Sequence, residues 1–327
     1  MSYILGISAF YHDSSAALIK NDHILGAVQE ERFTRIKHDS SFPKKSIEYL
    51  LNNEQIKLND LEAIVFYEKP FLKFERLLET YIAFAPFGFK SFAASMPVWL
   101  REKLFQKDNI YKNLQELDKN FKDIKKIKFS EHHLSHAASA FYPSPFNEAL
   151  ILTLDGVGEW STTTVSIGNE QGIKILKEIS FPHSLGLLYS AFTYYLGFKV
   201  NSGEYKVMGL APYGEPKYKD IILDKILSVK DDGSFKMNMK YFDFATDLKM
   251  TNKNFENLFG QKRRIPEKEN LTQFHMDIAS SIQKATEEIV IKITRDIRKE
   301  YNIKNLCMSG ITWTFIYLVR MESFTYF

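Results

Sequence analysis

The sequence predicts an α/β protein of two similar lobes, because one pattern of strands occurs once in each half of the chain. The pattern is a strand, a polar loop, a second strand, a tight turn and a third strand. Its first copy begins at Tyr3-Ile-Leu-Gly-Ile-Ser and turns at Asn21-Asp22, a step typical of hairpins. Its second copy begins at Ala149-Leu-Ile-Leu-Thr-Leu, an apolar run short enough for a buried strand.

A helix is predicted after each triplet of strands. The two helices span 43–53 and 184–195, and they begin at proline and serine, which favour helix starts. We place the first lobe at residues 1–146 and the second at 147–327, with an insertion that lacks strong periodicity at about 198–270. The loops after each first strand are expected to face one another across a cleft, with nucleotide phosphates between them.

Length and composition exclude several classes of protein. The 327 residues are 45% hydrophobic and 25% charged, which fits a globular protein and excludes fibrous and disordered classes. The net charge of +3 is slight, so no nucleic-acid partner is expected. The single cysteine, Cys307, fits a reducing compartment, and the sequence predicts neither a signal peptide nor a membrane span. We therefore expect a cytoplasmic protein with no membrane partner.

Two histidines and an aspartate predict a metal site. His132 and His136 stand at positions i and i+4, which share one face of a helix, so both imidazoles can reach one ion. Asp155, at the end of the buried strand that begins at Ala149, supplies the third ligand. This donor set suits Fe(II), Mn(II) or Zn(II). An ordinary polar cluster is the alternative, and His133, which would point about 100° away on the helix, is assigned to packing or to support of the ligands.

The loop Asp155-Gly-Val-Gly-Glu predicts a phosphate contact. Gly156 and Gly158 lack Cβ atoms, so their backbone N–H groups can approach an anion closely, and Glu159 completes the motif. A simple turn is the alternative.

Five motifs in order closely resemble the carbamoyltransferase family, which includes nodulation-factor and aminoglycoside or cephem O-carbamoyltransferases. The family is related to hydrogenase-maturation and tRNA-threonylcarbamoyl enzymes; the Glu204 motif favours the O-carbamoyl branch. The motifs are Gly6-Ile-Ser-Ala-Phe-Tyr-His-Asp-Ser-Ser-Ala-Ala, Glu30-Glu-Arg-Phe-Thr-Arg-Ile-Lys, His132-His-Leu-Ser-His-Ala, Asp155-Gly-Val-Gly-Glu and Glu204-Tyr-Lys-Val-Met-Gly-Leu-Ala-Pro-Tyr-Gly.

The resemblance implies a two-lobed actin-like, sugar-kinase-like ATPase fold of the duplicated ribonuclease-H-like kind, with the second lobe incomplete. It also implies a reaction, in which ATP and carbamoyl phosphate form carbamoyl adenylate with release of pyrophosphate and phosphate. The carbamoyl group then passes to a hydroxyl of a sugar or natural product. His132, His136 and Asp155 match the family's metal positions, where a divalent ion offsets phosphate charge, with Mg²⁺ as an alternative ion at the nucleotide.

Basic residues of the second motif are interpreted as the site for carbamoyl phosphate. Arg32, Arg35 and Lys37 follow a strand, and arginine grips phosphate oxygens two at a time; a solvated charged loop is the alternative. His12 and Asp13 are assigned with Lys37 to catalysis, since His12 could donate to a phosphate or carbamoyl oxygen.

The fifth motif, which begins at Glu204, yields one more candidate. Lys206 is interpreted as an anion contact, whereas Met208 and Leu210 are expected in the core.

After Gly310 the chain departs from the family pattern. Relatives continue with a glycine and an asparagine that binds adenosine, then a later acidic metal ligand, whereas this chain ends in an aromatic-rich segment at 311–327. We expect this departure to remove part of the adenosine pocket, one metal ligand and the acceptor domain. Two hypotheses follow: an O-carbamoyltransferase, and a non-catalytic remnant that binds metal or nucleotide. Self-association, or completion by a partner chain, stays open.

Overall fold

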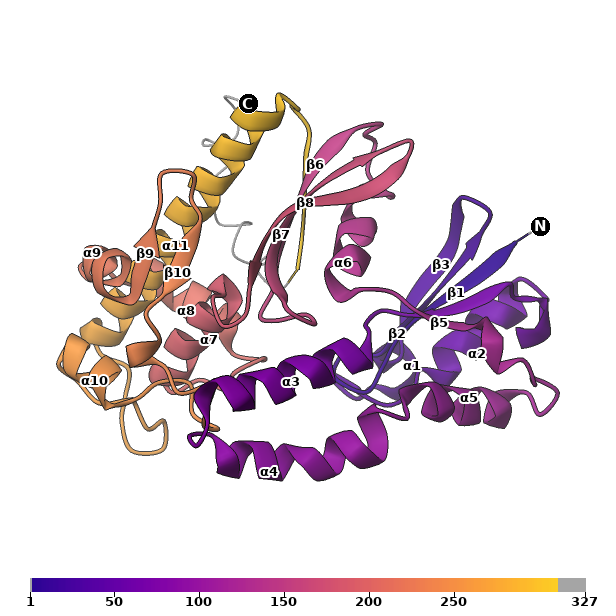
Figure 1. Ribbon diagram of the computed structural model, residues 1–327, viewed down its shortest axis with the longest axis horizontal. Coiled ribbons are helices and arrows are strands. Elements are labelled where there is room, and N and C mark those ends of the chain that lie inside the picture. The colour runs from indigo at the N-terminus through magenta and orange to yellow at the C-terminus, as the bar shows by residue number, and fades with distance from the viewer. Residues whose placement is uncertain (1, 311–327) are drawn as a thin grey trace. The chain divides into compact units, whose positions relative to one another are not determined.

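The computed structural model describes residues 2–310 and contains a mixed sheet in each half of the chain (Figure 1). The chain divides into two units, Met1–Arg76 with Ala93–Ser135 and Leu77–Phe92 with His136–Phe327. The lobes placed at 1–146 and 147–327 stay a prediction about domain boundaries. The predicted α/β class is confirmed, and the features expected of the segment after Gly310 lie outside the described residues.

The first unit holds a five-stranded sheet in the order β3-β2-β1-β4-β5. β1 to β3 are antiparallel neighbours, whereas β4 lies parallel to β1 and β5 lies parallel to β4. The predicted turn joins β2 to β3, with Asn21 in the left-handed region at φ 52°. The strands are β1 (Tyr3–Ser8), β2 (Ser15–Lys20), β3 (His23–Gln29), β4 (Ala63–Phe66) and β5 (Ile127–Phe129).

Helices cover this sheet and close its core. The helix predicted at 43–53 is confirmed as α2, and its Ile47 packs with Leu114 of α5 and with Leu5 of β1 in one apolar cluster. The buried Glu30 accepts the backbone amides of Lys45 and Ser46 and so caps the start of α2. The helical segments are α1 (Glu31–Thr34), α2 (Lys44–Asn53), η1 (Leu58–Asp60), α5 (Gln106–Leu117) and η3 (Ile124–Lys126).

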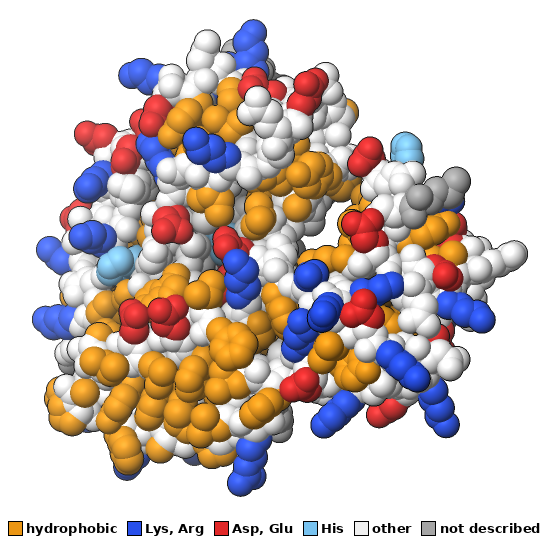
Figure 2. Space-filling view, turned by 45° about the vertical axis from the view of Figure 1, so that its right-hand side comes forward, with side chains coloured by type: hydrophobic (Ala, Val, Ile, Leu, Met, Phe, Trp, Pro, Cys, Tyr) orange, Lys and Arg blue, Asp and Glu red, His pale blue; other side chains and the backbone are white. Residues whose placement is uncertain are grey.

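A helical hairpin connects β4 to α5. It consists of α3 (Pro70–Phe84), α4 (Phe89–Val98) and the π-helical turn η2 (Trp99–Lys103). None of the described side chains from 71 to 105 is buried, although many of them are apolar. Figure 2 shows apolar side chains gathered over these helices in its lower part. The sequence patterns did not predict this hairpin.

The second unit repeats the strand order of the first. Its sheet runs β11-β6-β7-β8, with β6 to β8 antiparallel and β11 parallel to β6. Both sheets therefore share the arrangement in which the fourth strand lies beside the first, which is the topology of the duplicated ribonuclease-H-like fold. The strands are β6 (Ala149–Leu154), β7 (Ser161–Asn169), β8 (Gly172–Ser180) and β11 (Leu306–Ser309).

Helices lie on both faces of the second sheet. All six residues of β6 are buried, with Leu150 and Leu152 in the cluster of α7 and α11 and with Ile151 in the cluster of α6. Alternate side chains of a strand point to opposite faces, so this central strand contacts both helical layers. The helices are α6 (His132–Phe141), α7 (Leu185–Tyr195), which confirms the helix predicted at 184–195, and α11 (Gln273–Tyr301).

The segment at about 198–270 is folded, although its sequence has little periodicity. Val207, Ile222 and Phe255 are fully buried in the main core, and Met208 and Leu210 are core residues as predicted. Short elements of mixed type explain the weak periodicity, because no single repeat lasts long enough to be recognised. They are α8 (Glu204–Leu210), η4 (Ala211–Tyr213), α9 (Lys219–Ile221), η5 (Ile222–Ile226), β9 (Leu227–Val229), β10 (Phe235–Met237), η6 (Met239–Tyr241) and α10 (Lys253–Phe259).

Candidate metal and nucleotide site

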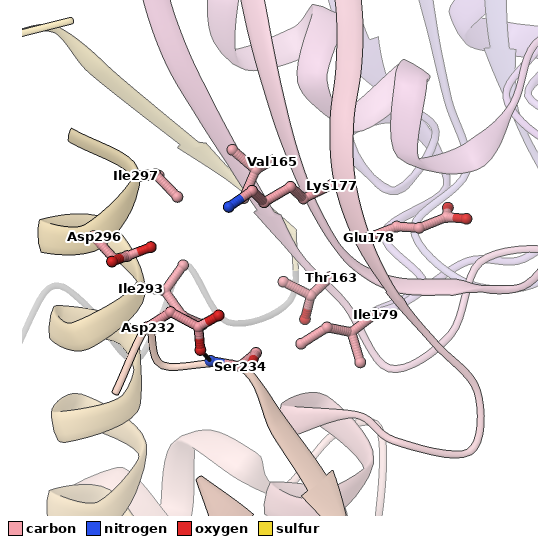
Figure 3. Close-up of a pocket in the computed structure, with 10 residues that line it drawn as sticks. All are labelled: Thr163, Val165, Lys177, Glu178, Ile179, Asp232, Ser234, Ile293, Asp296 and Ile297. Atoms are coloured by element: carbon pink, nitrogen blue, oxygen red, sulfur yellow. Dashed lines mark hydrogen bonds between the residues drawn. The ribbon is translucent and has the colours of Figure 1, made fainter. Parts of the chain in front are cut away.

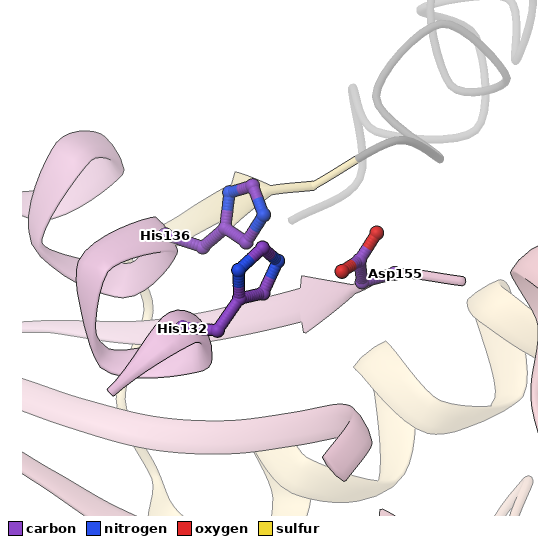
Figure 4. A group of neighbouring side chains, drawn as sticks. All are labelled: His132, His136 and Asp155. Atoms are coloured by element: carbon purple, nitrogen blue, oxygen red, sulfur yellow. The ribbon is translucent and has the colours of Figure 1, made fainter. Parts of the chain in front are cut away.

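The structure brings His132, His136 and Asp155 together. The two imidazoles lie one turn apart on the same face of α6, and the carboxylate follows the end of β6 (Figure 4). One ligand atom from each residue can be chosen so that all three lie within 4.8 Å of one another. Asp155 is buried, and the histidines are half-buried. The three donors thus fit a single divalent ion, and ligation itself stays a prediction.

A polar group lies near the Nδ1 atom of each imidazole ring. His132 Nδ1 lies 3.9 Å from a carboxylate oxygen of Glu68, and His136 Nδ1 lies 3.4 Å from the hydroxyl of Ser309 at the end of β11. The Ser309 hydroxyl is within hydrogen-bond distance of His136, and such a bond orients a metal-ligating histidine through the nitrogen that does not bind the ion. The Glu68 oxygen lies beyond hydrogen-bond distance of His132 Nδ1. His133 is 3% exposed and does not belong to the cluster, which agrees with its predicted packing role.

The loop from Asp155 to Trp160 is tightly folded. The amide of Gly156 donates to Asp155 Oδ1 at 2.7 Å, and the amide of Gly158 donates to the carbonyl of Ser161 at 3.0 Å. Glu159 is buried. Both glycine amides therefore have acceptors within the chain, so the phosphate contact expected of them stays a prediction.

Two residues that the sequence patterns did not connect with this loop hold it in place. Ser184 Oγ lies 3.0 Å from the carbonyl oxygen of Asp155 and 2.7 Å from that of Gly156, and it accepts the amide of Leu187 at the start of α7. A Cβ atom on Gly186 would lie 2.6 Å from the Asp155 carbonyl oxygen. Only glycine lets α7 begin this close to the loop.

The predicted catalytic residues of the first unit lie on two adjoining loops. His12 Nδ1 is 2.8 Å from Asp13 Oδ2, and Asp13 Oδ1 is 3.0 Å from His38 Nδ1. Four non-glycine residues of these loops have left-handed backbones, a conformation that clusters at functional sites. They are Phe10, Asp13, Arg35 and His38. His38 was not predicted as a site residue, although it directly follows Lys37.

The predicted anion-binding cations are exposed. Arg32 is in α1, Arg35 is its left-handed C-cap, and Lys37 follows in the loop. None of the three forms an ion pair with a described residue. Exposed cations on a loop fit an anion site, and they equally fit a solvated surface.

Lys206 is in α8, with its ammonium about 6.0 Å from the rings of Phe198 and Tyr205. The neighbouring Glu204 is buried and accepts the Ser190 hydroxyl and the amides of Asn201 and Gly203. This carboxylate fixes the turn before α8. It accounts for the glutamate of the motif, and the anion contact of Lys206 stays a prediction.

The second unit also contains a cavity of about 360 Å³ that involves none of the predicted site residues (Figure 3). Asp232 accepts the amide of Ser234 there at 2.8 Å, and Lys177 pairs with Glu300. Asp232 and Lys177 are thus engaged within the protein. The lining residues are Thr163, Val165, Lys177, Glu178, Ile179, Asp232, Ser234, Ile293, Asp296 and Ile297.

Among residues 2–310, no helix combines the length and the apolar character needed to cross a bilayer.

Comparison with known proteins identifies the family. A family model described as "Carbamoyltransferase N-terminus" matches residues 3–318. The chain belongs to the carbamoyltransferase family.

Curated relatives of the chain are longer than the chain itself. An uncharacterized protein of Synechocystis sp. is 59% identical over 311 residues, which are 95% of this chain and 50% of that protein. Nodulation protein NolNO of Sinorhizobium fredii is 32% identical over 306 residues, 93% of this chain and 41% of that protein. The chain thus spans about half the length of the curated relatives it matches.

Two solved structures are similar at low identity. Component A of the (R)-2-hydroxyglutaryl-CoA dehydratase of Acidaminococcus fermentans aligns with a TM-score of 0.44 and 15% identity, over 99% of this chain and 90% of that chain. HypF of T. kodakarensis aligns with a TM-score of 0.41 and 12% identity, over 96% of this chain and 43% of that chain.

Proposed function

We propose that this chain carries the site at which an O-carbamoyltransferase uses ATP and carbamoyl phosphate to form carbamoyl adenylate. The observation that carries the proposal is the convergence of His132, His136 and Asp155 at the end of a buried strand in a member of the carbamoyltransferase family. The predicted acceptor is a hydroxyl of a sugar or natural product. Both activating substrates are cytoplasmic metabolites, so we place the reaction in the cytoplasm.

The reaction balances in three steps. Water and carbamoyl phosphate give carbamate and phosphate. A carbamate oxygen then attacks the α-phosphorus of ATP, the bond to the β-phosphate oxygen breaks, and pyrophosphate leaves. An acceptor hydroxyl finally takes the carbamoyl group, with loss of its proton and release of AMP.

The residues of the chain have distinct roles in this proposal. His132, His136 and Asp155 would hold a divalent ion, namely Fe(II), Mn(II) or Zn(II), which supplies positive charge to offset that of the phosphates. The loop with Gly156, Gly158 and Glu159 would position the nucleotide. The contact of Ser309 with Nδ1 of His136 favours Nε2 as the ligand atom of that histidine.

Residues of the first unit would handle the second substrate. Arg32, Arg35 and Lys37 are exposed cations near one another in sequence, and they are assigned to carbamoyl phosphate, with Lys206 as a further anion contact. His12, held by Asp13, would exchange a proton with a phosphate or carbamoyl oxygen.

Pyrophosphate release tests the proposal. Protein supplemented with each divalent metal is given ATP with and without carbamoyl phosphate, beside a His132→Ala/His136→Ala variant. The matched control is His23→Ala, which removes an exposed histidine of β3. The proposal is supported if pyrophosphate release requires carbamoyl phosphate, persists in the control variant and is lost in the double variant.

Absence of release from folded, metal-loaded protein would refute it for this chain. That result would favour the alternative, in which the chain binds metal or nucleotide without catalysis. The twofold length of the relatives makes this alternative worth testing with a binding assay for ATP alone.

A further inference from the structure

One carboxylate joins two imidazoles in the first unit. Asp13 Oδ2 lies 2.8 Å from His12 Nδ1, and Asp13 Oδ1 lies 3.0 Å from His38 Nδ1. The side chains are 43% exposed for His12, 46% for His38 and 35% for Asp13. All three are thus accessible to a small molecule while they remain bonded to one another.

Backbone hydrogen bonds fix the two loops that carry these rings. The amide of Phe10 donates to the carbonyl of Ser40 at 2.9 Å, and the amide of Ser14 donates to that of Asp39 at 2.8 Å. On the first loop the bonded residues, Phe10 and Ser14, lie on either side of Asp13. On the second loop the bonded residues, Asp39 and Ser40, directly follow His38. The contact between Asp13 and His38 is therefore built into the backbone and does not depend on two freely moving side chains.

His38 is itself held in an unusual conformation. Its backbone is left-handed at φ 57°, and its amide donates to Glu31 Oε2 at 3.2 Å. Asp39 accepts the amide of Ser41 at 2.9 Å and the hydroxyl of Thr34 at 2.7 Å. A left-handed backbone costs free energy in a residue other than glycine. The surrounding hydrogen bonds therefore have to maintain the conformation that directs this ring towards Asp13.

We propose that His38 is a positioning residue that fixes the orientation and tautomer of His12 through Asp13. An ionised carboxylate only accepts hydrogen bonds, so each ring must present a protonated Nδ1 to it. With both oxygens bonded to rings, the carboxylate cannot rotate away from His12. The Nε2 atom of His12 is then the atom that meets a substrate, as a proton acceptor when the ring is neutral and as a donor when it is charged.

The ionisation of Asp13 supports this arrangement. Partial burial acts to raise the pKa of Asp13, but hydrogen bonds from His38 and His12, with the charges of the two rings, outweigh burial and lower that pKa below its ordinary value. Asp13 therefore remains an acceptor near neutral pH. The importance of His38 for catalysis rests on the proposed function, whereas its effect on the His12 tautomer does not.

Two variants separate the hydrogen bond from the backbone conformation. Asparagine and glycine both tolerate the left-handed region, so neither His38→Asn nor His38→Gly adds backbone strain. The amide of asparagine places an N–H group near the position of Nδ1, whereas glycine removes the donor. His38→Asp, which also tolerates this conformation and has no donor at neutral pH, replaces His38→Gly if the glycine variant fails to fold.

The first readout is the His12 tautomer, measured by long-range ¹H–¹⁵N correlation of histidine-labelled protein. We expect the Nδ1–H tautomer in the unchanged protein and in His38→Asn. We expect a mixture with the Nε2–H tautomer, which free imidazole side chains prefer, in His38→Gly. A glycine variant with the same His12 tautomer as the unchanged protein would overturn the proposal.

The second readout is steady-state pyrophosphate release. We expect kcat of His38→Gly to fall about tenfold with KM for carbamoyl phosphate nearly unchanged, and His38→Asn to restore most of kcat. Equal loss in both variants would also overturn the proposal, because His38 would then act by itself. If the unchanged protein releases no pyrophosphate, the proposed function fails, and the tautomer comparison still decides the role of His38.

Discussion

In the first unit the carboxylate of the loop after β1 accepts hydrogen bonds from side chains, whereas in the second unit the corresponding loop after β6 directs its backbone carbonyl oxygens to the start of α7. Asp13 accepts hydrogen bonds from two imidazoles, and Asp39 on the adjoining loop accepts the Thr34 hydroxyl and the backbone amide of Ser41. The second loop instead packs its own carbonyl oxygens against Ser184 and Gly186 at the start of α7.

Under the proposed function, this difference would let one topology support two kinds of site. Hydrogen bonds between side chains respond to protonation, which would suit the proton exchange proposed for the first loop. Backbone atoms packed against a helix start are rigid, which would suit the metal and nucleotide contacts proposed for the second loop. Substitutions in the two loops should therefore differ in size and in pH dependence.

The largest effect is expected at Gly186. Alanine there would place its Cβ atom 2.6 Å from the Asp155 carbonyl oxygen and 2.7 Å from the Gly156 amide. We expect the free energy of unfolding to fall by about 3 kcal/mol, because backbone atoms must move. Urea denaturation measures it. The control is Gly209→Ala, where nothing lies within 4 Å and alanine should stabilise the helix by about 0.5 kcal/mol. Equal stabilities of the two variants would contradict the packing argument.

Removal of one proposed metal ligand should have the next largest effect. His136→Ala leaves one imidazole and one carboxylate, and we expect the affinity for Zn(II) or Mn(II) to fall at least about a hundredfold, which is about 2.8 kcal/mol. Isothermal titration with each metal checks this. His133→Asn, at a buried histidine outside the cluster, should change stability more than metal affinity. Unchanged affinity in His136→Ala would exclude this site as the metal centre.

Ser184 tests the hydroxyl that holds the second loop. Ser184→Ala removes the N-cap of α7 together with the contacts to the carbonyls of Asp155 and Gly156. We expect a loss of about 1–2 kcal/mol in the free energy of unfolding and a weaker affinity for metal. Ser190→Ala in the same helix loses a single bond, to Glu204, and should leave metal affinity unchanged. Equal metal affinity in both variants would argue against a role of Ser184 at the site.

The smallest effect is a difference in pH dependence. Hydrogen bonds from the side chain and backbone of Ser41, and from Thr34, hold the pKa of Asp39 below its ordinary value. Its contribution to stability is therefore present above the unfolded-state pKa of about 4 and is lost as pH falls through the lower pKa of the folded state. Asp39→Asn should lose about 1 kcal/mol at pH 7 and show a flatter stability profile below pH 4.

Urea denaturation from pH 6 to pH 2.5 provides the test, with Asp22→Asn at the exposed turn of β2 and β3 as the control. Parallel profiles of Asp39→Asn and the unchanged protein would refute the assigned role of Asp39.

Much of this structure could be predicted from local patterns. Apolar runs such as Ala149-Leu-Ile-Leu-Thr-Leu predicted buried strands, and Ser184 predicted the start of a helix. The i, i+4 spacing of His132 and His136, with Asp155 at a strand end, predicted a convergence that depends only on helix geometry and sheet topology.

Contacts between distant loops could not be predicted in the same way. His38 approaches Asp13 because both residues have left-handed backbones, and no sequence pattern of residues other than glycine signals that conformation. The requirement for glycine at 186 likewise depends on how closely α7 starts beside the loop after β6. The hairpin of α3 and α4 was missed because the predicted elements were taken from the two repeated triplets of strands, and the segment between β4 and α5 lies outside that repeat.

That hairpin has a practical consequence for handling the protein. Its helices contribute no described buried side chain between 71 and 105, so little core packing opposes their local opening. Aromatic residues such as Phe87 and Phe89, 74% and 60% exposed, are preferred cleavage sites of chymotrypsin. Limited digestion should therefore cut first near residue 87, and the time course of that cut would report how often the hairpin opens.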